Sequence, residues 1–437
     1  MKDAYLWPDS AEIRQNTLHI AGQNLIHLAA QYGTPLYLFD ESTIIRTARA
    51  FQRGLEQYPA HTHVHYASKA FLNTAIAQLM SRLGVGLDVV SVGELAIGRH
   101  AGADLELMHM HGNATPRAEL EQAVAWGIGR ICVDNLNQLD TLIDICAKLG
   151  KRQTILLRIA PDVVAGGNTK IQTGSKKAKF GLNIADGSAC KALEIAYKSE
   201  HLNLVGLHAH TGSQIRSFEA LQATLERIFT VADMAHKAFG WQMQEICPGG
   251  GLFVPTNSSQ AAPKIADYCA VVTSTVQREA QQRGWPLPSI SIEPGRAMIT
   301  RSAVALYRVN GFKQLDDGTC YLHADGGIGD NLRPAMYNAV YGAMNANRPN
   351  SPANTSYRLA GRYCESGDIL IPNLNLPKTE LGDLIALPAA GAYTLSMASN
   401  YNGIGRPAVI LLRDSGPQLI QRRETWEDLL RRDVRLA

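Results

Sequence analysis

Residues 63–69 read His-Val-His-Tyr-Ala-Ser-Lys, a short strand-like run that ends on a lysine and passes directly into a helical pattern over residues 72–83. In a barrel of alternating strands and helices, the carboxyl ends of the strands lie on the face where the chemistry takes place. A lysine at such an end can be desolvated, which lowers its pKa and lets its nitrogen form a Schiff base. Most lysines are solvated surface residues, so Lys69 has to be judged together with the rest of the chain.

Seven further runs resemble the first, and helical patterns separate them. Several are continuously apolar, as expected when both faces of a parallel sheet are covered. The eight runs lie at residues 63–69, 86–91, 105–111, 130–135, 154–160, 204–210, 245–248 and 289–293. Eight strand–helix units over this length predict an α/β fold with a (β/α)8 TIM-like barrel. A doubly wound open sheet would give the same alternation and stays open as the alternative.

The two ends of the chain follow a different pattern. Residues 35–40 form a predicted strand before the barrel, and after about residue 297 short strands and turns dominate, apart from a helical pattern near 425–432. We expect a C-terminal mainly β domain that includes the N-terminal strand. The expected ranges are 1–45 for the N-terminal segment that joins the β domain, 46–297 for the barrel and 298–437 for the β domain. Residues 161–179 are expected to form a long mobile loop above the barrel.

The composition is that of an ordinary globular protein. Of the 437 residues, 46% are hydrophobic and 19% are charged, and the net charge of +3 is small for this length. We therefore expect no nucleic-acid partner and no membrane partner, the more so because no apolar stretch approaches the ~18 residues of a membrane span. The seven cysteines are scattered without a Cys-x-x-Cys pair, which argues against disulfides and a structural metal site and predicts a cytoplasmic protein.

Three glycines follow the seventh predicted strand, at Gly249, Gly250 and Gly251. Consecutive glycines let backbone N–H groups approach an anion closely, and the loop after the seventh strand of such a barrel is a recurrent phosphate site. Ser213, after the sixth strand, offers a hydroxyl to the same phosphate, and Arg296, after the eighth, adds a positive charge. A plain turn would explain the glycines equally well, so the prediction depends on the neighbouring residues.

Glu293 ends the eighth predicted strand, and a carboxylate beside a phosphate would be repulsive. It suits a protonated pyridine nitrogen instead, because this ion pair keeps the ring positive and makes it an electron sink. His210, at the end of the sixth strand, could lie flat on such a ring, and Arg158, at the end of the fifth, is a further candidate near it. Together with Lys69, these residues predict a site for pyridoxal 5'-phosphate.

Seven motifs resemble the group IV pyridoxal-phosphate decarboxylases, a family with an alanine-racemase-like fold that includes ornithine and diaminopimelate decarboxylases. They are residues 66–69 (Tyr-Ala-Ser-Lys), 208–214 (His-Ala-His-Thr-Gly-Ser-Gln), 248–251 (Pro-Gly-Gly-Gly), 293–296 (Glu-Pro-Gly-Arg), 330–334 (Asp-Asn-Leu-Arg-Pro), 364–368 (Cys-Glu-Ser-Gly-Asp) and 391–393 (Gly-Ala-Tyr). The resemblance implies that Lys69 forms the Schiff base, His210 stacks on the cofactor ring and Glu293 pairs with the pyridine nitrogen. It also implies that the glycine run and Ser213 hold the phosphate, and it adds Gly295 and Arg296 as cofactor-binding candidates.

The C-terminal motifs are similar to those of the diaminopimelate-type members. By that resemblance Arg296, Arg333 and Tyr337 hold substrate carboxylate, for which a guanidinium fork is suited, and Glu365 meets the distal ammonium. Tyr393 would contact phosphate or substrate. The implied reaction is the decarboxylation of meso-2,6-diaminopimelate to L-lysine and carbon dioxide, the last step of lysine biosynthesis.

Cys364 is implied to be the general acid that protonates the carbon from which carbon dioxide has left. In this family the cysteine and the glutamate that follows it come from the partner subunit. The resemblance therefore implies a homodimer with shared active sites.

The chain departs from the family at two places that bear on the substrate. Gly361-Arg362-Tyr363 stands where members often have Gly-Pro, and Gly166-Gly167-Asn168 occupies a loop in which diaminopimelate enzymes often carry histidines. One alternative is therefore a related decarboxylase of another carboxylated amino acid, such as carboxynorspermidine or a siderophore precursor. A non-catalytic relative is disfavoured by the retained lysine and cysteine, and an alanine racemase would have no use for Arg333 with Glu365.

Overall fold

The structure, a computed structural model, describes residues 1, 3–163, 179–258 and 261–436. The chain divides into two compact units, which are described separately. One comprises Thr47–Phe253 and Ala262–Met298, and the other comprises Met1–Arg46, Val254–Ala261 and Ile299–Ala437. The sequence analysis did not foresee that Val254–Ala261 would group with the two ends of the chain. Most of the loop expected at 161–179, including residues 166–168, lies outside the described residues.

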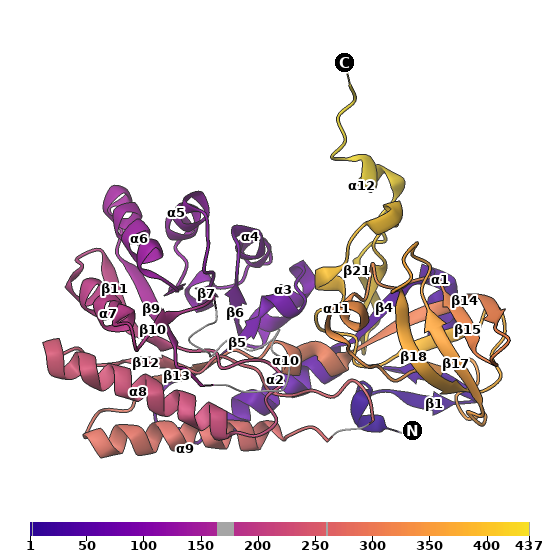
Figure 1. Ribbon diagram of the computed structural model, residues 1–437, viewed down its shortest axis with the longest axis horizontal. Helices are drawn as coiled ribbons and strands as arrows, with labels where there is room; N and C mark the ends of the chain where they lie inside the picture. The colour runs from indigo at the N-terminus through magenta and orange to yellow at the C-terminus, as the bar shows by residue number, and fades with distance from the viewer. Residues whose placement is uncertain (2, 164–178, 259–260, 437) are drawn as a thin grey trace. The chain divides into compact units, whose positions relative to one another are not determined.

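The first unit is a closed barrel of eight parallel strands with helices outside it (Figure 1). The strands are β5 (Thr62–Ala67), β6 (Gly86–Val89), β7 (Met108–Met110), β8 (Arg130–Val133), β9 (Gln153–Ala160), β11 (Leu202–His208), β12 (Glu245–Cys247) and β13 (Ser289–Ile292). They follow one another around the ring in chain order, and the pairing of β13 with β5 closes it. The predicted barrel is confirmed, and an open sheet is excluded. The short β10 (Leu182–Asn183) pairs with β9 outside the ring.

The helices of this unit begin and end at residues that satisfy their free backbone groups. At the start of α6, for example, the side chain of Asn135 accepts a hydrogen bond from the backbone N–H of Gln138, and Gly150 ends the helix with a φ of 61°. The helices are α3 (Thr74–Arg82), α4 (Val92–His100), α5 (Arg117–Trp126), α6 (Leu136–Leu149), α7 (Ser188–Lys198), α8 (Glu219–Phe239) and α9 (Ile265–Arg283). The helix α2 (Glu41–Leu55) begins in the other unit, and the short α10 (Arg296–Ile299) follows β13. Within the described ranges, every helix is too short or too polar to cross a lipid bilayer.

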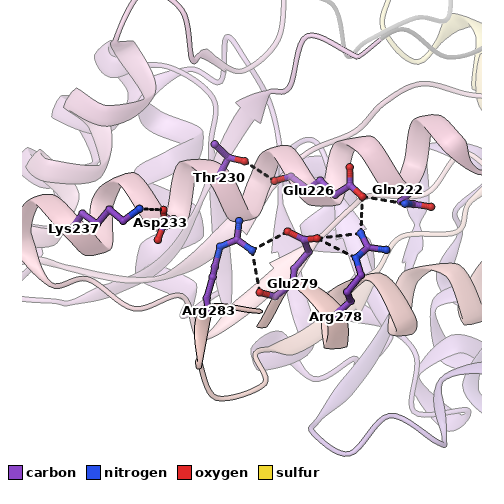
Figure 2. Close-up of polar contacts among 8 residues, drawn as sticks. All are labelled: Gln222, Glu226, Thr230, Asp233, Lys237, Arg278, Glu279 and Arg283. Atoms are coloured by element: carbon purple, nitrogen blue, oxygen red, sulfur yellow. Dashed lines mark hydrogen bonds and ion pairs between the residues drawn. The ribbon is translucent and has the colours of Figure 1, made fainter. Parts of the chain in front are cut away.

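Charged side chains join α8 and α9 on the outside of the barrel (Figure 2). Arg278 contacts Glu226 at 2.5 Å and Glu279 at 3.0 Å, and Arg283 contacts Glu279 at 2.8 Å. We call these four residues the outer cluster. The side chains of Glu226 and Arg278 are each 41% exposed, so water screens this pair and it contributes little to stability, whereas the side chain of Glu279 is only 9% exposed.

The second unit is built on a sheet of nine strands, seven of which follow the order β18-β17-β15-β14-β4-β20-β21. These are β18 (Ile369–Leu376), β17 (Thr355–Ala360), β15 (Cys320–Ala324), β14 (Ala303–Gln314), β4 (Leu36–Asp40), β20 (Ala408–Arg413) and β21 (Gly416–Gln421), with β19 (Leu384–Leu387) pairing with β14 and β16 (Met344–Asn345). A small sheet of β1 (Glu12–Arg14), β2 (Thr17–Ile20) and β3 (Gln23–Asn24) and the helices α1 (Leu25–Tyr32), α11 (Arg333–Tyr337) and α12 (Trp426–Leu430) complete it.

The N-terminal strand β4 lies in the middle of this sheet. It pairs antiparallel with β14 and parallel with β20, so the expectation that it joins the β domain is confirmed. Leu36 and Leu38 pack with Val304, Leu306 and Ile410 in one apolar cluster, because alternate residues of adjacent strands share a face. Burying each such side chain completely stabilises the fold by roughly 1.5–3 kcal/mol relative to leaving it exposed.

Candidate active site

The carboxyl ends of β5, β11, β12 and β13 carry the barrel residues that the sequence analysis singled out. All barrel strands are parallel, so these ends lie at one rim of the barrel, where barrel enzymes carry out their chemistry. The strand β5 ends at Ala67, and Lys69 lies in the single 3-10 turn Ser68–Ala70 that follows. The sequence analysis expected Lys69 to be desolvated, whereas its side chain is exposed.

The loop Gly249–Gly251 requires residues without side chains. Gly249 and Gly251 have φ angles of 73° and 105°. A Cβ on Gly250 would lie 2.1 Å from the backbone oxygen of Glu293, and one on Gly251 would lie 2.2 Å from that of Gly212. Ile215 donates its N–H to the oxygen of Gly251 at 2.8 Å. The loops after β11, β12 and β13 therefore pack backbone against backbone.

This packing brings three predicted residues to the glycine loop. Gly250 donates its N–H to Nδ1 of His210 at 3.4 Å, and Arg296 donates to the hydroxyl of Ser213 at 3.4 Å. Burial, together with the nearby charges of Lys69 and Arg158, lowers the pKa of His210 well below its ordinary value. Since Nδ1 accepts a hydrogen bond, both observations indicate a neutral imidazole ring.

Arg158 lies at the same rim, near the end of β9. Its Nε is 3.8 Å from a carboxylate oxygen of Asp134, and its guanidinium lies 4.6 Å from the ring centre of Phe180. The charge of Arg158 is thus held in place by an anion and an aromatic face.

Glu293, which follows β13, is buried between two histidines that the sequence analysis did not assign. Its Oε2 accepts a hydrogen bond from Nε2 of His208 at 3.1 Å. Its Oε1 lies 3.0 Å from Nε2 of His111, but the geometry is that of an ion pair and not of a hydrogen bond. Oε1 of Glu293 is thus a buried acceptor without a hydrogen-bond donor among the described residues.

Electrostatics keep these groups charged. Burial alone would raise the pKa of Glu293, but His111 and His208 outweigh it and hold this pKa well below the ordinary value. Burial would lower the pKa of His111, yet Asp88 and Glu293 raise it well above the ordinary value. Burial would likewise lower the pKa of His208, which Cys132 and Glu293 raise instead. We call Asp88, His111, Cys132, His208 and Glu293 the inner cluster.

A pattern in the sequence could have revealed the histidines of the inner cluster. Three strands carry His-x-His, at residues 63 and 65, 109 and 111, and 208 and 210. Residues two apart in a strand lie on the same side of the sheet, and in a closed barrel one of the two sides points inward. Glu94, near the start of α4, was also missed: burial raises its pKa to about 7, and its Oε2 accepts the N–H of Val90.

Spacing alone would also admit a metal ion in the inner cluster. His111, Cys132 and His208 present atoms within 4.8 Å of one another, as do His208, Cys247 and Glu293. We interpret Nε2 of His111 and Nε2 of His208 as partners of the Glu293 carboxylate and not as metal ligands, because they lie 3.0 and 3.1 Å from its oxygens. The expectation that the protein uses no metal stays a prediction.

The predicted substrate residues belong to the second unit. Arg333 is buried and donates a hydrogen bond from Nη1 to the hydroxyl of Tyr341 at 2.6 Å. Tyr337, at the other end of the short helix α11, is half-buried. Tyr393 is half-buried as well, with a φ of 59° that is uncommon for a residue with a side chain. The structure describes their surroundings within this unit and does not test their predicted roles.

Cys364 and Glu365 lie on an exposed loop that a buried carboxylate holds in shape. Asp368 accepts the N–H of Ile328 at 2.7 Å and that of Tyr363 at 2.8 Å. The backbone N–H of Cys364 donates a hydrogen bond to the side chain of Asn402 at 2.9 Å. The thiol side chain of Cys364 is exposed. Glu365 is exposed too. Both side chains are therefore presented outward on a fixed loop.

Residues 41–300 match the sequence profile of the pyridoxal-binding domain of pyridoxal-dependent decarboxylases. The diaminopimelate decarboxylase of Halalkalibacterium halodurans is 38% identical over 96% of both chains, and that of Bacillus subtilis is 37% identical over 98% of both chains. A crystal structure of diaminopimelate decarboxylase from M. jannaschii in co-complex with L-lysine superposes with a TM-score of 0.92 at 32% identity, over 98% of both chains.

Proposed function

This chain belongs to the family of pyridoxal-dependent decarboxylases, and we propose that it converts meso-2,6-diaminopimelate to L-lysine and carbon dioxide. The single observation that carries the proposal is the similarity to diaminopimelate decarboxylases over 98% of both chains, at 37% sequence identity. This similarity covers the barrel and the β domain alike.

The rim of the barrel fits pyridoxal 5'-phosphate as the cofactor. Oε1 of Glu293 is a buried charged acceptor that lacks a donor among the described residues, and a pyridinium N–H would satisfy it. The glycine loop, Ser213 and Arg296 offer N–H, hydroxyl and guanidinium groups for a phosphate, with Gly295 beside them. When bound, the cofactor supplies an aldehyde for amines and an electron-accepting ring.

The residues of the chain act around this group in separate roles. We propose that Lys69 holds it covalently and that the neutral imidazole of His210 lies against its ring. Glu293 would keep a proton on the ring nitrogen, because a carboxylate with a lowered pKa stays ionised beside a cation. Arg158 would add a positive charge at the rim.

We propose further that Arg296, Arg333 and Tyr337 hold substrate carboxylate, that Glu365 meets the distal ammonium and that Tyr393 contacts phosphate or substrate. Cys364 would deliver a proton to the carbon that has lost carbon dioxide. The exposed side chains of Cys364 and Glu365 on a fixed loop support a homodimer in which each protomer completes its partner's site. The seven free cysteines support a location in the cytoplasm.

The decisive experiment is to incubate the purified chain with pyridoxal phosphate and meso-diaminopimelate and to measure L-lysine. L-lysine should form with the wild type and not with Lys69→Ala. Carboxynorspermidine and L-ornithine serve as competing substrates. Faster release of carbon dioxide from either of them than from meso-diaminopimelate would overturn the substrate assignment and leave the cofactor assignment intact.

Mixing two inactive variants tests the shared site. In a homodimer with shared sites, Lys69→Ala and Cys364→Ala fall in the same site of a mixed dimer, so the other site of each mixed dimer is intact. An equimolar mixture, exchanged to equilibrium, should recover about a quarter of the wild-type activity. No recovery despite proven subunit exchange would place both residues in the site of one protomer.

A further inference from the structure

The two oxygens of Glu293 are treated differently by their neighbours. Oε2 receives a hydrogen bond from His208 at 3.1 Å, whereas Oε1 has an ionic contact with His111 at 3.0 Å and no hydrogen bond within the described residues. The side chains of His208, Glu293 and His111 are 1%, 6% and 8% exposed. Water therefore cannot readily replace any of these contacts.

The orientation of the carboxylate is fixed by this arrangement. A carboxylate has two oxygens in one plane, so a donor at Oε2 and a cation beside Oε1 determine how that plane is turned. His111 is itself held between two anions, because its Nε2 lies 3.6 Å from Asp88 and 3.0 Å from Glu293. The ring of His111 packs against that of His208 with centres 4.8 Å apart.

We propose that His208 and His111 are positioning residues that orient Glu293 so that its Oε1 accepts a hydrogen bond from the ring nitrogen of the cofactor. This inference rests on the proposed use of pyridoxal phosphate, and it assigns a role to two residues to which the sequence analysis gave none. His208 fixes the carboxylate through Oε2. His111 balances its charge without occupying the lone pair of Oε1 that the cofactor needs.

Several other groups act on the same carboxylate and have to be considered in any test. Those whose charges or hydrogen bonds act on Glu293, His111 or His208 are His65, Asp88, His109, Cys132, His210 and Cys247, on six strands and their ends, and Tyr268 on α9. Asp88 is the anion that compensates His111. The ring nitrogens of His208 and His111 lie at ion-pair distance from the carboxylate oxygens of Glu293, at 3.1 and 3.0 Å.

The proposal is tested by comparing two cofactors on the full-length protein freed of bound cofactor. Pyridoxal phosphate has a ring nitrogen, and its 1-deaza analogue has a carbon in that place. The dissociation constant of the deaza analogue divided by that of pyridoxal phosphate isolates the contribution of the ring nitrogen. His208→Leu, which loses the hydrogen-bond donor to Glu293, should weaken the binding of pyridoxal phosphate about 10- to 100-fold. It should change the affinity for the deaza analogue less than threefold. His208→Gln, which keeps an N–H donor, should recover part of the loss.

Glu293→Gln should reduce the same ratio, and adding His208→Leu to it should have no further effect, because both act on one hydrogen bond. His111→Gln provides a second variant should His208→Leu fail to fold. The control is His236→Gln, since His236 is a half-buried histidine on α8 whose Nδ1 lies 3.1 Å from the backbone oxygen of Trp241, away from the inner cluster. Its affinity ratio should equal that of the wild type.

Equal weakening of both cofactors in His208→Leu and His111→Gln would show a general structural role and overturn the proposal. An unchanged ratio in folded variants would overturn it as well. These readouts do not involve diaminopimelate, so a wrong substrate assignment would leave them unaffected. Failure of the wild type to bind pyridoxal phosphate would instead refute the proposed function itself.

Discussion

The Glu226–Arg278 pair of the outer cluster and the inner cluster of the barrel have similar contact distances but opposite surroundings. Arg278 and Glu226 lie 2.5 Å apart with side chains 41% exposed, whereas Glu293 lies 3.0 and 3.1 Å from two histidines with all three side chains at most 8% exposed. In water the shorter pair contributes little, because solvent screens it and side-chain entropy opposes it. In the interior every charge without a partner costs several kcal/mol. Distance alone therefore does not rank charged contacts.

The largest difference between the clusters should appear when one anion is removed from each. Glu293→Ala removes the common anionic partner of two buried histidines and should cost about 3–5 kcal/mol of unfolding free energy. The matched exterior variant, Glu226→Ala, should cost about 0.2–1 kcal/mol. Urea unfolding of both variants measures this contrast. Similar losses would mean that the inner cluster reorganises around the gap.

A second contrast concerns glycines at the rim and on the outside. Gly251→Ala would place a Cβ 2.2 Å from the oxygen of Gly212 at a φ of 105°, and it should cost about 3 kcal/mol. Gly240→Ala, at the end of α8, has a φ of 76° and no atom within 4 Å, so it should cost only about 1 kcal/mol. Thermal unfolding of both variants tests the ranking. A smaller cost at Gly251 would show that the loop can move aside.

The pH dependence of stability should also separate the clusters. The pKa of His111 is raised in the folded protein, so its stabilisation is fully present below the unfolded pKa of about 6.5 and is lost as pH rises through the folded pKa. The stability difference between wild type and His111→Gln should be largest near pH 6 and should shrink at higher pH, by at most about 1.4 kcal/mol per pH unit. Urea midpoints at pH 6, 7.5 and 9 measure it. Arg278→Ala should show no such trend, and a difference that grows with pH would contradict the assignment of a charged His111.

The smallest effect should come from Arg278, one of the two cations of the outer cluster. Arg278→Ala should lower stability by about 0.2–1 kcal/mol at low salt, and the loss should fade in 0.5 M NaCl because salt screens exposed charges. Melting temperatures at both salt concentrations are sufficient. A loss above 2 kcal/mol that persists in salt would mean that the network is far less solvated than its exposure indicates.

The barrel could be predicted from the sequence because its strands are buried on both faces and separated by helices. The eight predicted runs all became strands, and the residues at their ends include Lys69, His210 and Glu293. The inner cluster could not be predicted in this way, because its members come from different strands and only the closed ring brings them together. The His-x-His spacing in three strands was the available signal.

The β domain was harder to predict. Thr355–Ala360 and Gly416–Gln421 are difficult to recognise as strands in the sequence, because they mix buried and exposed residues without the continuous apolar run that marks the barrel strands. The small sheet of β1, β2 and β3 was missed for another reason. Its strands are only two to four residues long, too short for a pattern to develop.

The place of β4 in its sheet has a consequence for synthesis. Leu36–Asp40 leave the ribosome early, whereas the neighbours Ala303–Leu306 and Ala408–Leu412 are translated only after the entire barrel. All five residues of β4 are buried in the folded protein. This apolar strand therefore stays without its neighbouring strands while most of the chain is translated. The nascent chain therefore exposes an aggregation-prone apolar segment during most of its translation. Chaperones that bind unfolded chains should crosslink to residues 36–40 until the last strands emerge from the ribosome.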